Sequence, residues 1–403
     1  MNAPRVRLVF QQPALPKYRV PFFRELARRP GIDLCICHAR RPNLPNAPAD
    51  GFVARYVPDR PVQVGGITLY WHAPQWQYAA PPTDVLVLTW DVHFLSLVPA
   101  LLRARANGVP TILWGHGYSK QDAGWRRAAR EGAARLATAL VFYNRTVAER
   151  FIEAGWDPQR IHVAPNSLDQ APIQSARRQW LARSQELAAF ASAHQLCPGP
   201  VLLFVARLDR ERRVDLLLRA VAGLAADHPH LRAVIIGTGP QMSALKSLAA
   251  SLGIAGRLTF TGAVYDEQNL APWFLSSTLM CFPSNMGLSL LHAFGYGLPV
   301  VTTGNLNAHG PEIEALRPGE NGLFYRDGDA ADLEATLRRA LADRDLLQRM
   351  SREAHRTATE LYSIERMADG MEGAVRYCLM QAGRKRRSVP ALMIRDGKDP
   401  KMV

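Results

Sequence analysis

The 403-residue sequence is poor in cysteine and has no long apolar run. Its cysteines are scattered and never reach the CxxC spacing of a metal or redox site: Cys35, Cys37, Cys197, Cys281 and Cys378. We therefore expect reduced thiols. No segment approaches the roughly eighteen apolar residues of a membrane-spanning helix, and the opening MNAPRVRLVF lacks the apolar core of a signal peptide. These absences predict a cytoplasmic protein that does not cross a membrane.

Acidic residues are too few to balance the basic ones, and the formal net charge is +14. Residues 1–172 carry 21 Lys and Arg against 12 Asp and Glu, residues 173–380 carry 21 against 21, and residues 381–403 carry 7 against 2. This asymmetry favours a polyanionic partner, such as an anionic membrane surface or nucleic acid. A composition rich in arginine, in a protein with no such partner, would produce the same charge distribution. Because no nucleic-acid-binding module is recognisable, we expect no nucleic acid partner.

Strand and helix patterns alternate along the whole chain. The first half contains the apolar strands RVRLVF, IDLCIC, DVLVLTW, VPTILWG, ALVFYN and IHVA, with shorter strands near 52–57 and 67–71. The second half contains VLLFVA, RAVIIG, RLTFTG, TLMCFP, LPVVT and NGLFY, with helices near 214–226, 240–252, 267–275, 288–296 and 329–344. Such alternation predicts α/β domains with parallel sheets and right-handed crossovers.

These patterns divide the chain into two similar Rossmann-like domains that face each other across a cleft. We expect a first domain over 1–172, one linker helix over 173–200 and a second domain over 201–362. A crossover helix over 363–380 would return to the first domain, followed by a basic tail over 381–403. This helix places its apolar residues on one face: Ile364, Met367, Met371, Val375 and Leu379.

The turn after the strand VLLFVA carries the strongest chemical signal. Arg207 and Arg212 lie between the carboxyl end of a buried strand and the start of a helix. Ligands of open α/β sheets bind at this edge, and two cations beside a helix N-terminus favour a diphosphate. A solvated basic turn is an equally good explanation of this stretch alone.

Other loops offer weaker signals. Gly237 and Gly239 form a GxG turn at a strand end, and Gly287, Leu288 and Ser289 form a turn whose N–H groups suit phosphate or sugar oxygens. An N-cap without a ligand explains the second turn equally well. Asn166, before the domain junction, is interpreted as a turn residue.

Basic and aromatic residues gather at the start of the first helix. Lys17, Tyr18 and Arg19 precede Phe22 and Phe23. This combination suits a lipid-phosphate acceptor or a membrane surface. Packing in the helix core is the commoner role of such phenylalanines, but Lys17 and Arg19 need not be buried with them.

Over about residues 5–375 the chain resembles the family 4 (group 1) glycosyltransferases of the GT-B fold. The segments that carry the resemblance follow the order of the family: FVARLDRERR, VIIGTGP, RLTFTGAV, FPSNMGLSLLHAFGYGLPVV and PEIEALRPGENGLFYRDGD. In the first half, PALPKYRVPFFREL, ILWGHGYSK and VAPNSLD resemble a bacterial subgroup that assembles surface polysaccharides and lipid-linked glycans.

The resemblance implies a retaining hexosyltransferase whose substrate is a nucleotide-diphosphate sugar and whose acceptor is a glycan or a lipid-linked glycan, at the inner face of the membrane. Arg207 and Arg212 fall where the family binds the diphosphate, and Arg213 falls on a family glycine. His116, between two glycines that leave it open access to a cleft, falls near the family histidine that touches the donor sugar. Tyr118 and Lys120 would line the acceptor side.

One departure concerns the Glu-x7-Glu pattern of the family, because its two positions hold Ser284 and His292 here. Both side chains, and Asn285, are able to hydrogen-bond sugar hydroxyls. Glu312 and Glu314 are proposed substitutes for the missing carboxylates, although acidic residues also favour a helix start.

No metal or cofactor is expected. The DGD at 327–329 fits a turn that opens a helix better than a metal site, and the two arginines would neutralise the leaving diphosphate instead. Two alternatives stay open, a nucleotide-sugar epimerase of the same architecture and a catalytically degenerate scaffold subunit.

Overall fold

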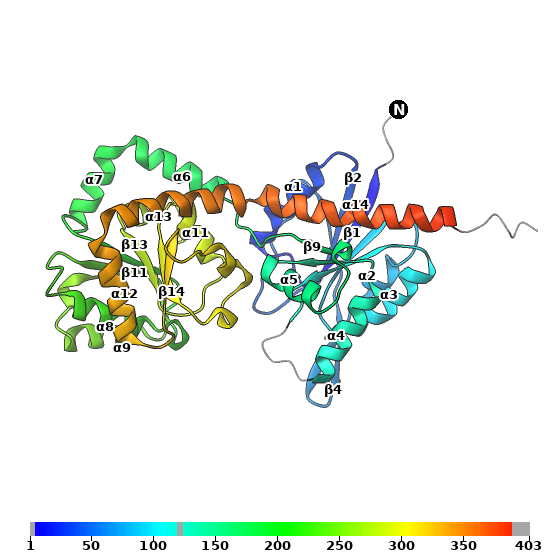
Figure 1. Ribbon diagram of the computed structural model, residues 1–403, viewed down its shortest axis with the longest axis horizontal. Helices are drawn as coiled ribbons and strands as arrows, with labels where there is room; N and C mark the ends of the chain where they lie inside the picture. Colours follow the sequence, from blue (N-terminus) through cyan, green and yellow to red (C-terminus); the bar gives the residue numbers. More distant parts are fainter. Residues whose placement is uncertain (1–4, 119–123, 389–403) are drawn as a thin grey trace, which may run out of the picture.

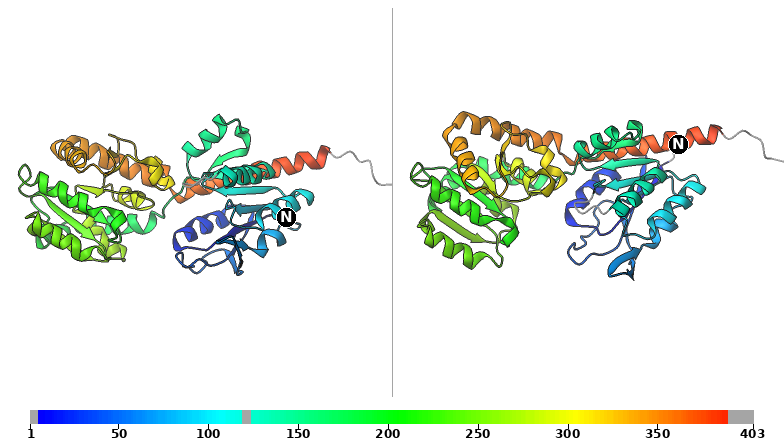
Figure 2. Two further views of the ribbon diagram at one scale, coloured as in Figure 1. Left: turned by 90° about the horizontal axis from the view of Figure 1, so that it is seen from below. Right: turned by 60° about the horizontal axis from the view of Figure 1, so that its bottom comes forward.

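The structure is a computed structural model that describes residues 5–118 and 124–388. Two α/β domains lie side by side (Figure 1). A long helix, α14 (Ile364–Ser388), leaves the second domain and runs along the first, and the turned views show the same arrangement (Figure 2). Within the described residues, no helix is both long and apolar enough to cross a bilayer.

The first domain is built on a parallel sheet in the order β3-β2-β1-β6-β7-β8-β9. The strands are β1 (Val6–Gln12), β2 (Ile32–His38), β3 (Val53–Tyr56), β6 (Val85–Thr89), β7 (Thr111–Gly115), β8 (Ala139–Phe142) and β9 (Ile161–Val163). Their central members are apolar because helices cover both faces.

Helices form a layer on each face of this sheet. The short 3-10 helix η1 (Lys17–Arg19) leads into α1 (Val20–Arg28), which packs with α14 on one face. The helices α3 (Leu97–Ala106), α4 (Gly124–Leu136) and α5 (Arg145–Glu153) cover the other. Phe22 and Phe23 are fully buried against Phe10 and Trp114, so core packing is confirmed for both.

Two small elements interrupt this pattern between β3 and β6. The hairpin of β4 (Arg60–Val64) and β5 (Ile67–Trp71) precedes the short helix α2 (Ala73–Gln77). The sequence predicted β5 but not β4. Every residue of β4 is exposed, so this strand has no apolar pattern to reveal it.

The second domain repeats the design with a parallel sheet in the order β12-β11-β10-β13-β14-β15. The strands are β10 (Val201–Val205), β11 (Arg232–Ile236), β12 (Leu258–Gly262), β13 (Leu279–Phe282), β14 (Val300–Thr303) and β15 (Gly322–Tyr325). One helical layer contains α8 (Val214–Leu224), α9 (Met242–Ser251) and α12 (Ala330–Ala342), and the other contains α10 (Glu267–Leu275), α11 (Ser289–Gly295) and α13 (Arg344–Arg356). Two parallel Rossmann-like domains, as predicted, are thus confirmed.

The expected single linker helix is wrong. The segment forms two helices, α6 (Ala171–Ala182) and α7 (Ser184–Ala193), that break at Arg183, whose φ of −106° and ψ of 54° are not helical. Ile173 and Ala176 belong to the core of the second domain, and Trp180 Nε1 donates to the carbonyl of Gln268 at 2.8 Å. The segment bends because it wraps the second domain.

Helix α14 ties the second domain to the first. Ile364, Met367, Met371 and Val375 are buried in one core with the strands of the first domain, and Leu379 packs on the same core. A Cβ on Gly370 would lie 2.0 Å from the carbonyl oxygen of Val163, so the helix backbone meets β9 directly. The predicted return of the chain to the first domain is confirmed, although the helix is longer than the predicted 363–380.

Candidate functional site

The turn after β10 brings two arginines to the carboxyl edge of the second sheet. Arg207 is exposed. Arg212, at the end of the 3-10 helix η3 (Arg210–Arg212), donates from Nη1 to the carbonyl of Asn285 at 3.1 Å, which ties this turn to the loop after β13. Both cations therefore lie at the sheet edge where an anion would be held by charge and by helix N–H groups.

Arg213 has a left-handed backbone, with φ of 52° and ψ of 37°, directly before α8. Most residues with side chains disfavour this conformation, and glycine adopts it freely. The conformation explains why a glycine suits this position in the family. In this chain the Arg213 side chain instead pairs with Asp215 at 3.5 Å.

Gly237 and Gly239 allow two neighbouring turns to touch. A Cβ on Gly237 would lie 1.9 Å from the carbonyl oxygen of Ala206, and one on Gly239 would lie 2.3 Å from that of Leu208. Leu208 N donates to Thr238 O at 2.9 Å, which joins the turns. Backbone contact alone accounts for both glycines, and a role in donor binding stays a prediction.

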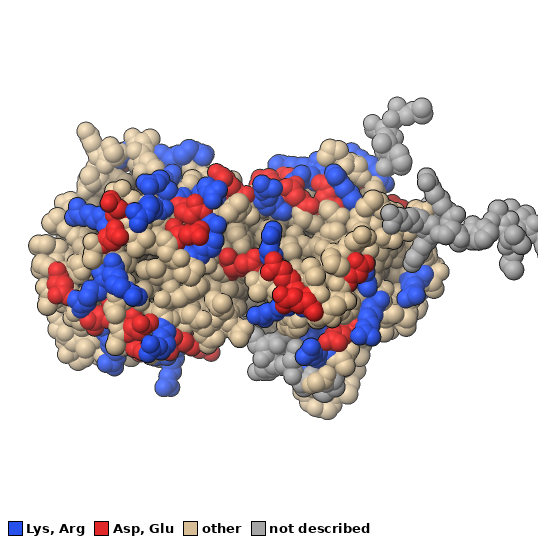
Figure 3. All heavy atoms as spheres, viewed as in Figure 1, with Lys and Arg blue, Asp and Glu red and all other residues tan. Residues whose placement is uncertain are grey.

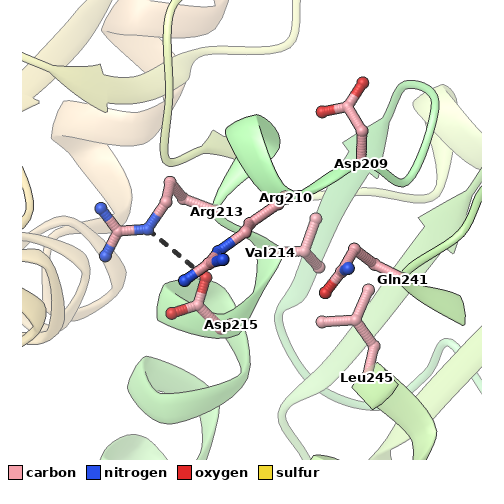
Figure 4. Close-up of a pocket in the computed structure, with 7 residues that line it drawn as sticks. All are labelled: Asp209, Arg210, Arg213, Val214, Asp215, Gln241 and Leu245. Atoms are coloured by element: carbon pink, nitrogen blue, oxygen red, sulfur yellow. Dashed lines mark ion pairs between the residues drawn. The ribbon is translucent and has the colours of Figure 1, made fainter. Parts of the chain in front are cut away.

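A pocket of about 390 Å³ lies beside this turn, between the starts of α8 and α9 (Figure 4). Its lining consists of Asp209, Arg210, Arg213, Val214, Asp215, Gln241 and Leu245. The lining includes neither Arg207 nor Arg212, and its two acids offset its two arginines. We therefore place the candidate donor site at the sheet edge and not in this pocket.

The loop after β13 presents buried polar atoms to the same edge. Ser284 is 6% exposed, and none of the described residues pairs with its Oγ. Further along, Met286 N donates to Nδ1 of the buried His309, whose Nε2 donates to Thr303 O at 2.9 Å. Gly287, Leu288 and Ser289 then lead into α11 as predicted. His309 fixes this loop, and the sequence analysis missed it because the histidine comes from a distant irregular segment.

His292 does not present a free imidazole. Its Nε2 lies 2.9 Å from Oε1 of Glu267 on α10, and the hydroxyl of Tyr296 donates to the same oxygen at 2.5 Å. Burial acts to raise the pKa of Glu267, but hydrogen bonds from His292 and Tyr296 hold that pKa below its ordinary value. The carboxylate is therefore ionised at neutral pH. The sequence analysis missed Glu267, since twenty-five residues separate it from His292.

Two acids of the second domain contact the first domain. Glu312 is buried and accepts from Asn166 Nδ2. Glu314 accepts from the backbone N–H groups of Arg145 and Thr146, at 3.1 and 2.8 Å, and so caps α5 across the domain boundary. In this conformation both oxygens of Glu314 bind protein, while its predicted role in donor binding stays untested.

The first domain contributes His116 from the end of β7. His116 is exposed and its ring centroid lies 4.7 Å from that of Tyr143. The glycines beside it serve packing rather than access. A Cβ on Gly115 would lie 2.9 Å from Trp90 Cβ, and Gly117 has φ of +70° with only 2.6 Å to Phe142.

The predicted acceptor side is only partly assembled. Lys17 is exposed, whereas Arg19 is 7% exposed and lies in the core although it need not be buried there. Its guanidinium lies over the rings of Trp114 and Tyr143, at 4.6 and 4.9 Å, because a delocalised cation is stable against aromatic faces. Tyr18 lies beside the same guanidinium, while Tyr118 packs at a tilt against Phe151, and Lys120 falls outside the described residues.

The DGD segment is a helix-opening turn, as predicted. Asp327 accepts from Thr303 and Asn305, and Asp329 caps α12. Across the described ranges, no three His, Cys, Asp or Glu side chains gather closely enough to hold a metal ion.

Two Rossmann-like domains side by side, with a basic turn at the edge of the second sheet, have the arrangement of the GT-B fold class. Residues 195–357 match the model of the family "Glycosyl transferases group 1". The second domain is therefore similar to the glycosyltransferases of this family.

Curated relatives extend the match. A D-inositol 3-phosphate glycosyltransferase of Geodermatophilus obscurus is 33% identical over 254 residues, which are 60% of this chain and 53% of that protein. The lipopolysaccharide core biosynthesis glycosyltransferase LpsE of Rhizobium meliloti is 26% identical over 226 residues, 55% of this chain and 59% of that protein. The chain thus spans less than two thirds of the length of either relative.

Solved structures share the fold over nearly the whole chain. HepE of Anabaena, solved in complex with UDP, superposes with a TM-score of 0.65 at 16% identity and covers 92% of this chain and 99% of its own. A glycosyltransferase from Rickettsia africae gives a TM-score of 0.68 at 13% identity, with 94% and 99% covered. These likenesses confirm the GT-B fold.

Proposed function

We propose that the protein is a retaining glycosyltransferase that moves a sugar from a nucleotide-diphosphate sugar to a hydroxyl group of a glycan or lipid-linked acceptor. One observation carries the proposal: Arg207 and Arg212 lie together at the carboxyl edge of the second sheet, and Arg212 is fixed to the loop after β13. The match of residues 195–357 to the group 1 glycosyltransferases supports the same reaction class.

The reaction needs no protein nucleophile in this proposal. The acceptor hydroxyl attacks the anomeric carbon on the face that the diphosphate leaves, the bond from that carbon to the phosphate oxygen breaks, and a phosphate oxygen takes the proton of the hydroxyl. Arg207 and Arg212 neutralise the charge that develops on the diphosphate. Positioning of both substrates between the domains supplies the remaining acceleration.

The acceptor class is argued from relatives and from charge. LpsE is named for the lipopolysaccharide core and the Bacillus relative EpsD is a putative glycosyltransferase, so an envelope glycan is a fitting acceptor here. The basic first half fits an anionic membrane surface that carries a lipid-linked acceptor. Charged residues of both signs are interspersed on the face in Figure 3, so this attraction would come from other faces or from the tail.

The test is donor hydrolysis and binding with a panel of UDP-, GDP-, ADP- and dTDP-sugars. We expect one donor to bind and to be hydrolysed slowly, and Arg207→Ala and Arg212→Ala each to slow nucleotide release by about 100-fold or more. Arg210→Ala is the matched control, because Arg210 lies on the same turn but points into the adjacent pocket (Figure 4). NMR of the product formed on a simple acceptor alcohol would report retention.

Failure of every donor and free nucleotide to bind would contradict the proposal and favour the scaffold alternative. Conversion of the bound sugar to an epimer, without transfer, would favour the epimerase. An inverted product would contradict the retaining mechanism alone.

A further inference from the structure

The carboxylate of Glu267, in the first turn of α10, is held by two hydrogen bonds from side chains of α11 and the residue after it. Two donors, His292 Nε2 and the Tyr296 hydroxyl, converge on its Oε1. Its second oxygen, Oε2, receives no hydrogen bond from any of the described residues. The side chain keeps 26% of its surface exposed. One oxygen is therefore held in place while the other stays available to a ligand.

The position of Glu267 relative to the arginines follows from the strand order. The first turn of α10 comes directly after β12, which neighbours β11, which neighbours β10. Gly237 N donates to Gly262 O at 2.8 Å, so the GxG turn lies against the end of β12. A nucleotide whose diphosphate rests on the turn after β10, and whose nucleoside lies over the ends of β11 and β12, would therefore reach the first turn of α10.

We propose that Glu267 accepts hydrogen bonds from the ribose hydroxyl groups of the nucleotide, so that the donor is a ribonucleoside diphosphate sugar rather than a 2′-deoxyribonucleoside one. This inference rests on the proposed function and specifies the donor class. The available oxygen, Oε2, is suited to the ribose because it is charged and has two lone-pair sites that accept hydrogen bonds from neighbouring hydroxyl groups.

His292 and Tyr296 act as positioning residues in this arrangement. The ring of Tyr296 stacks on Phe274, with centroids 4.8 Å apart and planes at 22°, and the ring of His292 packs edge-on against the same phenylalanine. Both rings are thereby fixed, and their two hydrogen bonds hold Oε1 of the carboxylate in place. The carboxylate absent from position 292 of α11 is thus supplied by the neighbouring helix.

The test is isothermal titration of the full-length protein with UDP, GDP and ADP. The tightest of the three is then compared with its 2′-deoxy form. We expect wild type to bind the ribonucleotide about tenfold or more tightly than the deoxynucleotide, because a hydrogen bond to a charged group is lost. Glu267→Gln should remove most of this preference, whereas Glu334→Gln, a matched change on α12 of the same domain, should keep it.

Tyr296→Phe separates positioning from folding. It removes one donor to Glu267 but keeps the ring stack, so the ribonucleotide should lose more affinity than the deoxynucleotide, which makes one hydrogen bond fewer to Glu267. Tyr377→Phe, on α14, is the control that removes a hydroxyl far from this site. If Tyr296 has a purely structural role, Tyr296→Phe would weaken the binding of both nucleotides equally. That result would contradict the positioning role.

The outcomes distinguish a failure of the proposed function from a failure of the role assigned to Glu267. If none of the three nucleotides binds wild type, the proposed function itself fails. If a nucleotide binds but its 2′-deoxy form binds as well, or if Glu267→Gln keeps the wild-type preference, the role of Glu267 is overturned and the proposed function is not.

Discussion

Asn166 Nδ2, just after the last strand of the first domain, donates a hydrogen bond to Oε1 of Glu312 in the second domain. Both residues are buried, at 7% and 3% exposure. Among the described residues, Asn166 Oδ1 and Glu312 Oε2 have no hydrogen-bond partner. The two domains are thus joined by a polar contact that is only half satisfied, which makes its energy sensitive to protonation.

The first prediction concerns the pH dependence of stability. Burial raises the pKa of Glu312, although Asn166 and the charge of Arg19 act against it. The folded state then holds this proton more tightly than the unfolded state, so stability falls as pH rises from about 4 toward the raised pKa. Glu312→Gln removes this loss, and its melting temperature relative to wild type should increase as the pH rises above about 4.

Glu353 provides a control of opposite sign. Hydrogen bonds from Arg356, together with the charges of Arg356 and Arg317, lower the pKa of Glu353. Its contribution is present above the ordinary glutamate pKa and lost as pH falls below it. Glu353→Gln should therefore lower the melting temperature at neutral pH and less so in acid. If the melting temperatures of Glu312→Gln and Glu353→Gln, each relative to wild type, changed in the same way with pH, both pKa directions would be contradicted.

The second prediction concerns the glycine after His116. Gly117 has a positive φ and no room for a Cβ beside Phe142. Gly117→Ala should cost about 2 kcal/mol or more in the free energy of unfolding, from strain and overpacking together. Chemical denaturation measures this cost. Gly132→Ala, in the open interior of α4, should instead stabilise by up to about 1 kcal/mol, and a similar loss at both sites would refute the packing explanation.

The third prediction concerns the contact of Glu314 with the start of α5. Asn144 already caps this helix within the first domain, by accepting from Val147 N. Glu314→Ala should therefore leave the helix intact but weaken the closed arrangement of the domains. We expect a larger radius of gyration by small-angle scattering and faster proteolysis between the domains. Glu320→Ala, at an exposed site of the second domain, is the control and should change neither quantity.

The fourth prediction uses the left-handed backbone of Arg213. Arg213→Gly should be tolerated, whereas Arg213→Val should unfold with about 2 kcal/mol less free energy than Arg213→Gly, because a β-branched side chain is strained there. The same two changes at Arg210, whose φ is not positive, should differ by less than about 1 kcal/mol. If the Gly and Val variants differed by the same free energy of unfolding at both positions, backbone strain at Arg213 would not be the cause.

Much of the architecture could be predicted because buried parallel strands have continuous apolar sequences. The run VLLFVA became β10, and the apolar face of Ile364, Met367 and Met371 correctly placed α14 in a core. The break at Arg183 could not be predicted, since it follows the curvature of a domain surface and not any local breaker. The exposed strand β4 likewise left no periodic trace.

The site was predictable only where its residues are local in the sequence. Arg207 and Arg212 share one turn, and that turn lies at the expected edge. The pair of Glu267 and His292 joins two helices, and the pair of Asn166 and Glu312 joins two domains, so neither has a spacing signal. The burial of Arg19 depends on an aromatic cage drawn from β7 and the residue after β8, which composition alone does not disclose.

The path of the chain between the domains has a mechanical consequence. Within residues 124–388 the chain crosses twice, between β9 and α6 and again before α14. The crossings stay adjacent, because Gly370 meets the backbone of Val163 and His355 bonds Gln174 at 2.9 Å. Two domains joined along one edge rotate about that edge as a hinge, and the residues farthest from the hinge move most. In the proposed function, the angle between the two domains would therefore set how widely the space between them opens to a substrate.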